Sequence, residues 1–316
     1  MVTIDLITGF LGCGKTTFLE RYAAYWKKKG ANICILENDY GAVNVDMMLL
    51  GHLEGENCGL EMVAGGCDYD CHRRRFKTKL IAMGMLGYDR VLVEPSGIFD
   101  VDEFFDVLYE EPLDRWYQAG SVIAIVDGGL EDTLSPQSEY LLASETAKAG
   151  VVLLSKTQLC QREELAHTVA HLNRAMEQAG CSRRFGGDVV EKPWDCFTDA
   201  DFQRIASAGY VHASFRKLPI HDDNAYQSLY YMNLPVAPES LRERVEAVMN
   251  DPACGRVFRV KGFVPLPEGG WLELNSTKRN VSLKPIARGQ EIIIVIGEEL
   301  NQAAVDAHMG GRSVTA

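Results

Sequence analysis

The strongest chemical signal in the sequence is a glycine-rich segment, GFLGCGKT, at residues 9–16. It fits the pattern G-x-x-x-x-G-K-[ST] and lies between a predicted strand and a predicted helix, the context that a phosphate-binding loop requires. Its glycines let backbone N–H groups surround phosphate oxygens, and the helix N-terminus adds positive charge. We expect Lys15 to contact the β- and γ-phosphates and the Thr16 hydroxyl to ligate Mg²⁺. The same loop supplies the other expected nucleotide contacts: Gly9, Gly12, Cys13, Gly14 and Thr17.

An acidic residue must complete such a magnesium site, and the segment RVLVEPSG at residues 90–97 supplies one. Glu94 ends an apolar strand, so we predict that it holds Mg²⁺ or its waters. The alternative is a carboxylate that merely caps the next turn. The Gly97 amide is placed to sense the γ-phosphate, and Asp39 in the segment ENDYG is a candidate switch carboxylate. Lys15, Asp39 and Glu94 are therefore the predicted catalytic residues.

The elements that position these residues alternate between strands and helices. Continuous apolar strands separated by helices indicate a mostly parallel sheet covered by helices on both faces, which is the α/β fold class. Residues 65–72 are predicted to form a loop. Strands are predicted at 2–7, 32–36, 59–63, 90–94, 121–127 and 150–155, and helices at 16–29, 73–86, 101–109, 137–148 and 163–179.

The pattern changes in the last third of the chain. A helix at 238–249 is followed by four closely spaced strands and a final helix that begins near residue 301. This order predicts a small α+β domain with an antiparallel sheet. We therefore expect two domains, at residues 1–212 and 213–316.

Composition narrows the possible partners. The 316 residues include 32 Lys+Arg and 44 Asp+Glu, which gives a formal charge of −12 and argues against binding to nucleic acid or an anionic membrane. No apolar run approaches the roughly 18–20 residues that span a bilayer, and no signal peptide is visible. The nine cysteines are interpreted as reduced thiols, so a cytoplasmic protein is expected.

Taken together, these motifs resemble the CobW-type P-loop GTPases, a group that also contains the urease and hydrogenase nickel-insertion GTPases. GFLGCGKTT matches the family's phosphate loop, ENDYG resembles its N-E-F-G switch, and EPSG matches its E-x-x-G segment. The C-terminal segments RVKGFVPLPEGGWLELN and IIIVIGEELN resemble the C-terminal domain of the two-domain CobW branch. The resemblance therefore covers almost the whole chain.

This resemblance implies a GTPase domain followed by a CobW C-terminal-like domain. It also implies that hydrolysis of GTP, with Mg²⁺ as cofactor, is coupled to delivery of a metal such as zinc or cobalt. The receiving partner would be a client metalloprotein or maturation target.

The cysteine segment departs from the family motif G-C-x-C-C. Here the sequence is GGCDYDCH, which retains Cys67 but places Tyr69 and Asp70 at the other two thiol positions, with Cys71 and His72 following. Thiolate and imidazole ligands favour Zn²⁺, Co²⁺ or Ni²⁺ over Mg²⁺. We predict that Cys67, Cys71 and His72 bind such an ion. The alternatives are cysteines that only pack, beside a solvated His72, or a thiol redox pair.

The base-recognition loop also differs from the family motif. The family has N-K-x-D, whose aspartate accepts two guanine N–H bonds in a charge-assisted, bidentate contact. This chain has Ser155, Lys156 and Gln158 at the corresponding positions. Lys156 can stack along the base, but Gln158 cannot reproduce the two-oxygen geometry, so we expect only a weak preference for GTP over ATP. Ser155 replaces the asparagine that ties this loop to the phosphate loop, so a less pre-organised loop is also expected.

Three functions follow from these residues. The first is a metal-linked nucleoside triphosphate hydrolase that acts as a metallochaperone or a maturation factor for metalloenzymes or cofactors. The second is a nucleotide-dependent binding module that contacts a client with little or no turnover. The third is a small-molecule kinase, which an acceptor-dependent rate would identify.

Overall fold

The computed structural model describes residues 1–39, 45–65, 69–216 and 226–315. The chain separates into two compact units, Met1–Leu218 and Pro219–Ala316. The domain limits expected from the sequence, 1–212 and 213–316, stay a prediction about where the two domains can be separated.

A six-stranded parallel sheet forms the centre of the first unit, in the order β3-β2-β4-β1-β5-β6. The central strand β1 is buried because neighbouring strands flank it and helices cover it, which explains its continuous apolar sequence. Since all six strands are parallel, their carboxyl ends meet at one edge. The strands are β1 (Val2–Thr8), β2 (Ile33–Asp39), β3 (Cys58–Ala64), β4 (Arg90–Pro95), β5 (Tyr117–Asp127) and β6 (Val151–Ser155).

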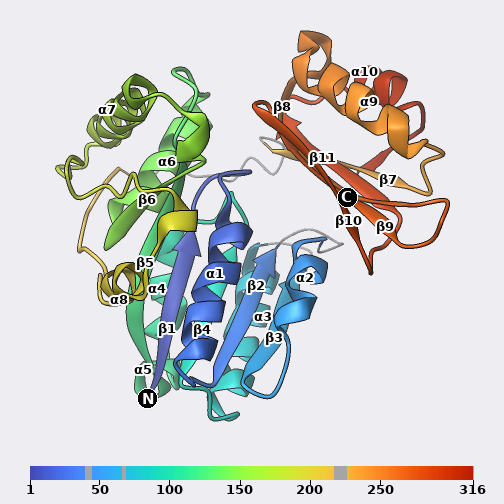
Figure 1. The fold of residues 1–316 in the computed structure, drawn as a ribbon. Helices are drawn as coiled ribbons and strands as arrows, with labels where there is room; N and C mark the ends of the chain where they lie inside the picture. Colours follow the sequence, from blue (N-terminus) through green and yellow to red (C-terminus); the bar gives the residue numbers. More distant parts are fainter. Residues whose placement is uncertain (40–44, 66–68, 217–225, 316) are drawn as a thin grey trace. The chain divides into compact units, whose positions relative to one another are not determined.

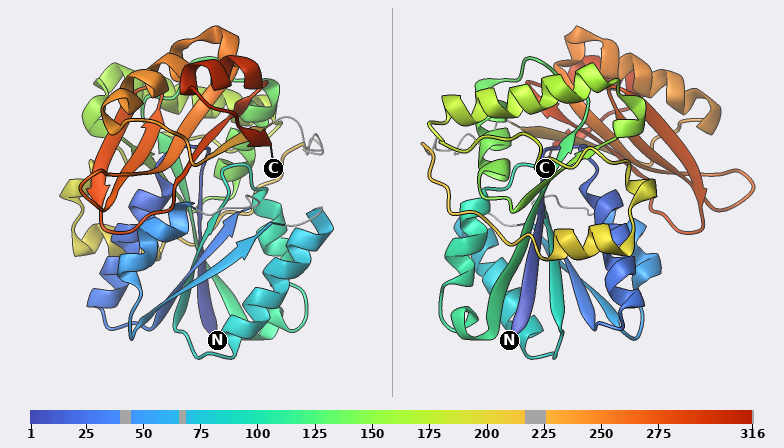
Figure 2. Two further views of the ribbon diagram at one scale, coloured as in Figure 1. Left: turned by 90° about the vertical axis from the view of Figure 1, so that its right-hand side faces the viewer. Right: turned by 60° about the vertical axis from the view of Figure 1, so that its left-hand side comes forward.

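Helices cover both faces of this sheet, and each face has its own apolar core. Phe18 and Tyr22 of α1 belong to one core, whereas Phe76 of α3 and Leu172 of α7 belong to the other. The turned view in Figure 2 shows the blue helix α1 and the cyan helix α3 on opposite sides. The helical elements are α1 (Lys15–Lys28), α2 (Val45–Leu50), η1 (Gly51–Leu53), α3 (Tyr69–Gly84), α4 (Val101–Leu108), α5 (Leu113–Trp116), α6 (Pro136–Ala147), η2 (Thr157–Leu159), α7 (Arg162–Gln178), η3 (Trp194–Cys196) and α8 (Asp199–Ala206).

Local capping explains where several of these helices begin. Asp100 accepts a hydrogen bond from the Asp102 N–H at the start of α4, and Ser135 accepts one from Ser138 at the start of α6. Pro136 then occupies the first helical position of α6, where its missing N–H has no consequence. Across the described residues, we find no helix with the length and apolar character needed to traverse a lipid bilayer.

The second unit contains an antiparallel six-stranded sheet in the order β10-β9-β8-β11-β7-β12. Two helices pack against it through one apolar core, which joins Val245 of α9 and Val305 of α10 to Val260 and Val295 of the sheet. Figure 1 shows this sheet and its two helices in orange and red. The elements are β7 (Gln227–Met232), α9 (Pro238–Asn250), η4 (Pro252–Cys254), β8 (Arg256–Pro265), β9 (Trp271–Thr277), β10 (Asn280–Ile286), β11 (Ile292–Glu298), α10 (Gln302–Met309) and β12 (Val314–Thr315).

Both parts of the predicted fold class are confirmed. The first unit is an α/β domain whose parallel sheet has helices on both faces, and the second is a small α+β unit. Within the first unit, the loop between β1 and α1 lies at the edge where the strands end, and this is the edge at which open α/β sheets bind their ligands.

Candidate nucleotide and metal sites

The predicted phosphate loop connects β1 to α1 in a conformation that needs glycine. Gly9, Gly12 and Gly14 have φ angles of 144°, 73° and 105°, values that other residues rarely adopt. A Cβ atom at Gly9 would also lie 2.2 Å from the backbone oxygen of Ile125. The spacing of glycines in the motif is therefore explained by backbone geometry and by close contact with β5.

Lysine and threonine follow the loop in the first turn of α1. Lys15 is buried, and its ammonium donates a hydrogen bond of 2.6 Å to the backbone oxygen of Gly9. The loop is thus folded around its own lysine, which can exchange this carbonyl for a phosphate oxygen. Thr17 is exposed on the same turn, whereas Cys13 is buried within the loop. Burial raises the pKa of the Cys13 thiol to about 11, so this cysteine serves packing rather than thiolate chemistry.

A carboxylate and a hydroxyl meet beside the loop. Glu94, at the end of β4, is buried, and its Oε1 accepts a 2.8 Å hydrogen bond from the Thr16 hydroxyl. These are oxygen ligands of the kind that Mg²⁺ prefers. A Cβ at Gly97 would lie 2.7 Å from the backbone nitrogen of Leu11, so Gly97 lies directly against the phosphate loop. Thr16 of α1, Glu94 of β4 and Gly97, two residues beyond β4, therefore come together beside the loop.

Several buried polar groups around this edge lack protein partners. Thr8 at the end of β1, Asn38 in β2 and Ser155 at the end of β6 have buried side-chain atoms with no hydrogen-bond partner among the described residues. Burying such atoms without a partner costs roughly 1–3 kcal/mol each. The carboxyl edge of the sheet is therefore built to fit a polar ligand, as a magnesium nucleotide would be.

The predicted base loop is tied to the phosphate loop by its lysine. Lys156 has a φ of 54°, and its ammonium donates to the Gly12 oxygen at 2.9 Å and to Asp127 Oδ2 at 2.7 Å. A less organised loop was expected because Ser155 replaces asparagine, but these two contacts supply a tie that the prediction left out. Gln158 is exposed in the following turn, η2, where it can meet a base.

Two residues near this loop carried no signal in the sequence motifs. Asp127 ends β5 and orients Lys156. Trp194, in η3, lies against the phosphate loop, since a Cβ at Gly14 would be 3.5 Å from its indole ring, and it packs edge-on against Phe18 at 5.6 Å. Because Trp194 is about 180 residues from Gly14 in the chain, only folding brings them together.

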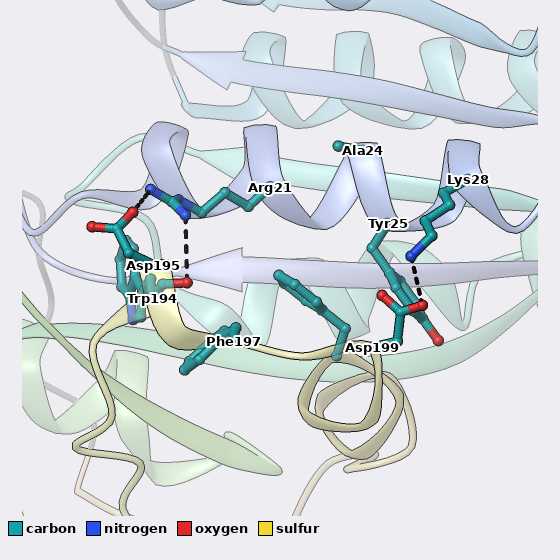
Figure 3. A pocket seen from close by; sticks show the side chains of 9 residues that line it. Arg21, Ala24, Tyr25, Lys28, Trp194, Asp195, Phe197 and Asp199 are labelled. Atoms are coloured by element: carbon teal, nitrogen blue, oxygen red, sulfur yellow. Dashed lines mark hydrogen bonds and ion pairs between the residues drawn. The ribbon is translucent and has the colours of Figure 1, made fainter.

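The segment that carries Trp194 is fastened to the outer face of α1. Figure 3 shows Arg21 reaching the carboxylate of Asp195 and the backbone oxygen of Trp194, while Lys28 pairs with Asp199 at 2.8 Å. Between these pairs lies a shallow groove of about 270 Å³. Its aromatic lining comes from Tyr25, Trp194, Phe197 and Phe202. These contacts hold the Trp194 ring beside the loop.

The candidate switch residue is placed only by its backbone. Asp39 is the last residue of β2 and pairs in register with Ala64 of β3. Its side chain and residues 40–44 lie outside the described residues, as does Cys67. The predicted roles of Asp39 and Cys67 therefore stay predictions.

The segment at residues 65–72 is not a continuous loop, so that prediction is wrong from Tyr69 onward. Helix α3 begins there because an apolar stripe that includes Phe76 packs on the sheet and extends the helix backward over Asp70, Cys71 and His72. Of the three predicted metal ligands, Cys71 and His72 are therefore helical neighbours.

The alternative in which His72 is solvated is also wrong. His72 is 0% exposed, and its Nδ1–H donates a 3.0 Å hydrogen bond to the Gly65 oxygen, so Nε2 carries the lone pair of the ring. A backbone carbonyl commonly orients a metal-ligating histidine in this way. Cys71 is only partly buried, and successive helical residues point about 100° apart. The two side chains therefore leave α3 in different directions.

Comparison with known proteins supports the predicted nucleotide-binding domain. The sequence profile described as "CobW/HypB/UreG, nucleotide-binding domain" matches residues 3–181. The zinc chaperone YeiR of Escherichia coli (strain K12) is 27% identical over 293 residues, which cover 85% of this chain and 84% of YeiR. The zinc chaperone YjiA of the same strain is 28% identical over 181 residues, which cover 54% of this chain but only 55% of YjiA.

Solved structures give a weaker likeness. The Zn(II)-bound YjiA GTPase from E. coli aligns with 98% of this chain and 98% of its own, with a TM-score of 0.38 and 19% identity. The hydrogenase maturation factor HypB from Archaeoglobus fulgidus aligns with 65% of this chain and 86% of its own, with a TM-score of 0.40 and 15% identity. The sequence profile spans more than half of the chain, and this protein therefore belongs to the CobW/HypB/UreG family, whose nucleotide-binding domain it carries.

Proposed function

We propose that this protein hydrolyses a nucleoside triphosphate, GTP in the first instance and ATP less well, and couples that reaction to the delivery of a transition metal. The observation that carries the proposal is the Thr16–Glu94 hydrogen bond beside Lys15, at the end of a glycine-defined loop. Two curated relatives are called zinc chaperones, although the alignment with YjiA spans only about half of that protein. The partner would be a client metalloprotein or maturation target.

Each residue of the proposed nucleotide site has a chemical task. Lys15 leaves the Gly9 oxygen and stabilises negative charge on the transferred phosphoryl group. Thr16 and Glu94 would hold Mg²⁺, which neutralises charge on the β- and γ-phosphates. Gly97 lies against the phosphate loop. A conformational change in the loop when the γ-phosphate binds is therefore transmitted directly to the end of β4. Asp39 is proposed as the switch carboxylate.

The metal is proposed to be a cargo bound by Cys67, Cys71 and His72, with Zn²⁺ first and Co²⁺ or Ni²⁺ as alternatives. The Gly65 carbonyl already orients His72 for binding through Nε2. Because Cys71 leaves α3 in another direction, one ion can be shared by both residues only if the first turn of α3 rearranges. Among the cysteines that the structure describes none is bridged, which supports the proposed cytoplasmic, reducing location.

Turnover is the direct test of the proposal. Phosphate release is measured with GTP and with ATP, each with and without Zn²⁺, Co²⁺ and Ni²⁺, in wild type and in Lys15→Ala. The matched control is Lys278→Ala, which removes an exposed lysine from the turn between β9 and β10 in the other unit.

We expect hydrolysis that Lys15→Ala nearly abolishes, that Lys278→Ala leaves unchanged, and that responds to one of the metals. Nucleotide binding without turnover would instead support the client-binding module, and a rate that requires a small-molecule acceptor would support a kinase.

A further inference from the structure

Three side chains with metal-binding atoms converge in the second unit, and none of them belongs to a motif discussed above. Asp251, Cys254 and His308 each offer one ligand atom, and these atoms all lie within 4.8 Å of one another. Among the described residues, this is the single group of three or more such side chains with that geometry. The family's cysteine motif does not include any of them.

The fold brings the three residues together through one turn and one helix. Asp251 follows α9, and its Oδ1 accepts a 2.9 Å hydrogen bond from the Ala253 N–H, which starts the η4 turn. Cys254 ends that turn, and its backbone oxygen accepts from Asn301 at 3.1 Å, just before α10. Helix α10 then carries His308 back beside Asp251, where Nε2 and Oδ2 are 2.7 Å apart. Hydrogen bonds thus hold Asp251 and Cys254 in the turn, and helix α10 brings His308 to them.

The three ligand atoms are of the kinds that bind a borderline transition metal. A thiolate, an imidazole nitrogen and a carboxylate oxygen suit Zn²⁺, Co²⁺ or Ni²⁺, whereas Mg²⁺ and Ca²⁺ take oxygen ligands. Ligand atoms around a tetrahedral zinc ion lie roughly 3.3–3.7 Å apart. The cluster needs shifts of about an ångström to reach that spacing, which side-chain rotation of Asp251 and His308 can supply.

Burial gives the cluster a closed side and an open side. Cys254 is 0% exposed, whereas the side chains of His308 and Asp251 are 32% and 36% exposed. An ion held here would have three protein ligands and one position facing solvent. A site with an open position exchanges ligands more readily than a closed four-ligand structural site.

A nucleophilic or redox thiol is a poorer explanation of the cluster. Cys254 is 0% exposed, whereas reactive cysteines are partly exposed to solvent. A purely structural ion pair between His308 and Asp251 explains their 2.7 Å contact but assigns no role to the adjacent thiol.

We propose that Asp251, Cys254 and His308 form a second transition-metal site, in the C-terminal unit, with one coordination position open to solvent. The site is independent of the cysteine segment near residue 67 and of nucleotide hydrolysis. It would hold one Zn²⁺ or Co²⁺ ion per chain, and its open position would accept water or a ligand from a partner.

Cobalt titration of the full-length chain tests this site. The background is a Cys67→Ser/Cys71→Ser variant under reducing, oxygen-free conditions, so that the first proposed site contributes no thiolate. We expect one equivalent of Co²⁺ to produce a thiolate-to-cobalt charge-transfer band, and Zn²⁺ to displace it. Adding Cys254→Ser should remove the band, whereas Cys181→Ser, which removes a buried cysteine of the first unit, should not. No band in the background, or a band that survives Cys254→Ser, overturns the proposal.

Two histidine variants separate metal binding from a structural role. His308→Gln removes the imidazole, and because even indirect partners of a metal contribute about tenfold to a hundredfold in affinity, we expect Co²⁺ to bind at least about a hundredfold more weakly. His308→Lys keeps a hydrogen-bond donor for Asp251, so the metal-free protein should unfold at the wild-type temperature. Zn²⁺ should raise the unfolding temperature of the background protein but not of this variant. A rise that persists in His308→Lys contradicts the site.

Discussion

The phosphate loop and the base loop lie at the same edge of one sheet but are specified differently. The phosphate loop is contiguous: glycines with positive φ and the Lys15–Gly9 hydrogen bond all fall within residues 9–16. The base loop is held by distant residues, with Lys156 bonded to Gly12 and to Asp127. Local geometry therefore defines the proposed phosphate site, whereas tertiary contacts position the residues that are proposed to meet the base.

This difference has a consequence for substitution. A contiguous loop whose backbone must adopt positive φ tolerates little change, because every alternative residue strains the same turn. A loop held by side-chain contacts from other strands can change its base-reading residues while its position is maintained. Gln158 in place of an aspartate fits that second case, since Lys156 and Asp127 hold the loop without it.

The largest expected effect is at the phosphate loop. Lys15→Ala should lower the turnover rate by about a hundredfold to a thousandfold, because one charge-stabilising donor is lost from the transition state. The rate is measured at saturating nucleotide, so that weaker binding does not account for the loss. A rate within a few-fold of wild type would remove Lys15 from the chemistry.

Glu94→Gln comes next. Glutamine can still accept the Thr16 hydrogen bond, so the substitution tests the charge rather than the contact. We expect a turnover rate about tenfold to a hundredfold lower, together with a higher Mg²⁺ requirement, because second-sphere and ligand changes at metal sites have effects of this size. If added Mg²⁺ has the same half-saturating concentration in both proteins, Glu94 only caps the next turn.

Substitutions in the base loop are expected to change the selectivity between GTP and ATP rather than the turnover rate. Wild type should prefer GTP over ATP by only about tenfold to a hundredfold, since loss of a charged acceptor costs roughly 1.5–3 kcal/mol. Gln158→Asp should sharpen that preference, and Gln158→Asn is the control that shortens the side chain without adding charge. The measurement is the dissociation constant of GTP and of ATP in wild type and in both variants. Discrimination by several orders of magnitude in wild type would mean that another residue reads guanine.

A smaller effect is expected at the tie between the loops. Asp127→Ala removes one of the contacts that hold Lys156, and the affinity for GTP should fall about twofold to fivefold, since partly exposed ion pairs contribute under about 1 kcal/mol. Asp106→Ala, an exposed acid on α4, serves as the control. Equal dissociation constants for the two variants would show that Asp127 does not organise the base loop.

A pH dependence tests the buried carboxyl of Glu145, on α6. Its oxygens have no hydrogen-bond partner among the described residues, and burial raises its pKa well above the usual value, although Lys15 opposes the shift. A raised pKa means that its stabilising contribution is complete below the unfolded-state pKa and is lost as pH rises through the folded-state pKa.

Glutamine does not ionise, so the Glu145→Gln variant does not lose this contribution. We therefore expect the free energy of unfolding of the variant to rise relative to that of wild type as the pH rises from acid to neutral. Urea midpoints at several pH values measure the difference. Parallel curves for the two proteins would mean that Glu145 keeps an ordinary pKa.

Much of the fold was predictable because its signals are local. Apolar strands of β-branched residues and amphipathic helices predicted the parallel sheet, and the order of elements near residues 238–301 predicted the α+β unit. The short helix α8 was missed. Its sequence DADFQRIA has only two large apolar residues, Phe202 and Ile205, and the helix is stabilised by a Thr198 cap and by the contact of Phe202 with α1.

The cysteine segment shows where sequence patterns mislead. GGCDYDCH contains glycines and polar residues that are typical of loops, yet packing on the sheet extends α3 over its second half. The alternative of a solvated histidine beside arginines is wrong because His72 is buried, and its position on the helix decides which way its side chain points.

The sequence by itself determined the phosphate-loop motif and the class of both folded units, and it pointed to Lys15, Thr16 and Glu94 as the residues proposed to carry the chemistry. These rest on backbone rules that act over a few residues, where glycine, strand and helix preferences apply directly. Only the tertiary structure decided that Trp194 lies on the loop, that Asp127 holds Lys156, and that a thiol, an imidazole and a carboxylate converge at the end of α9. Such contacts join residues far apart in the chain, and their geometry exists only once the cores have packed.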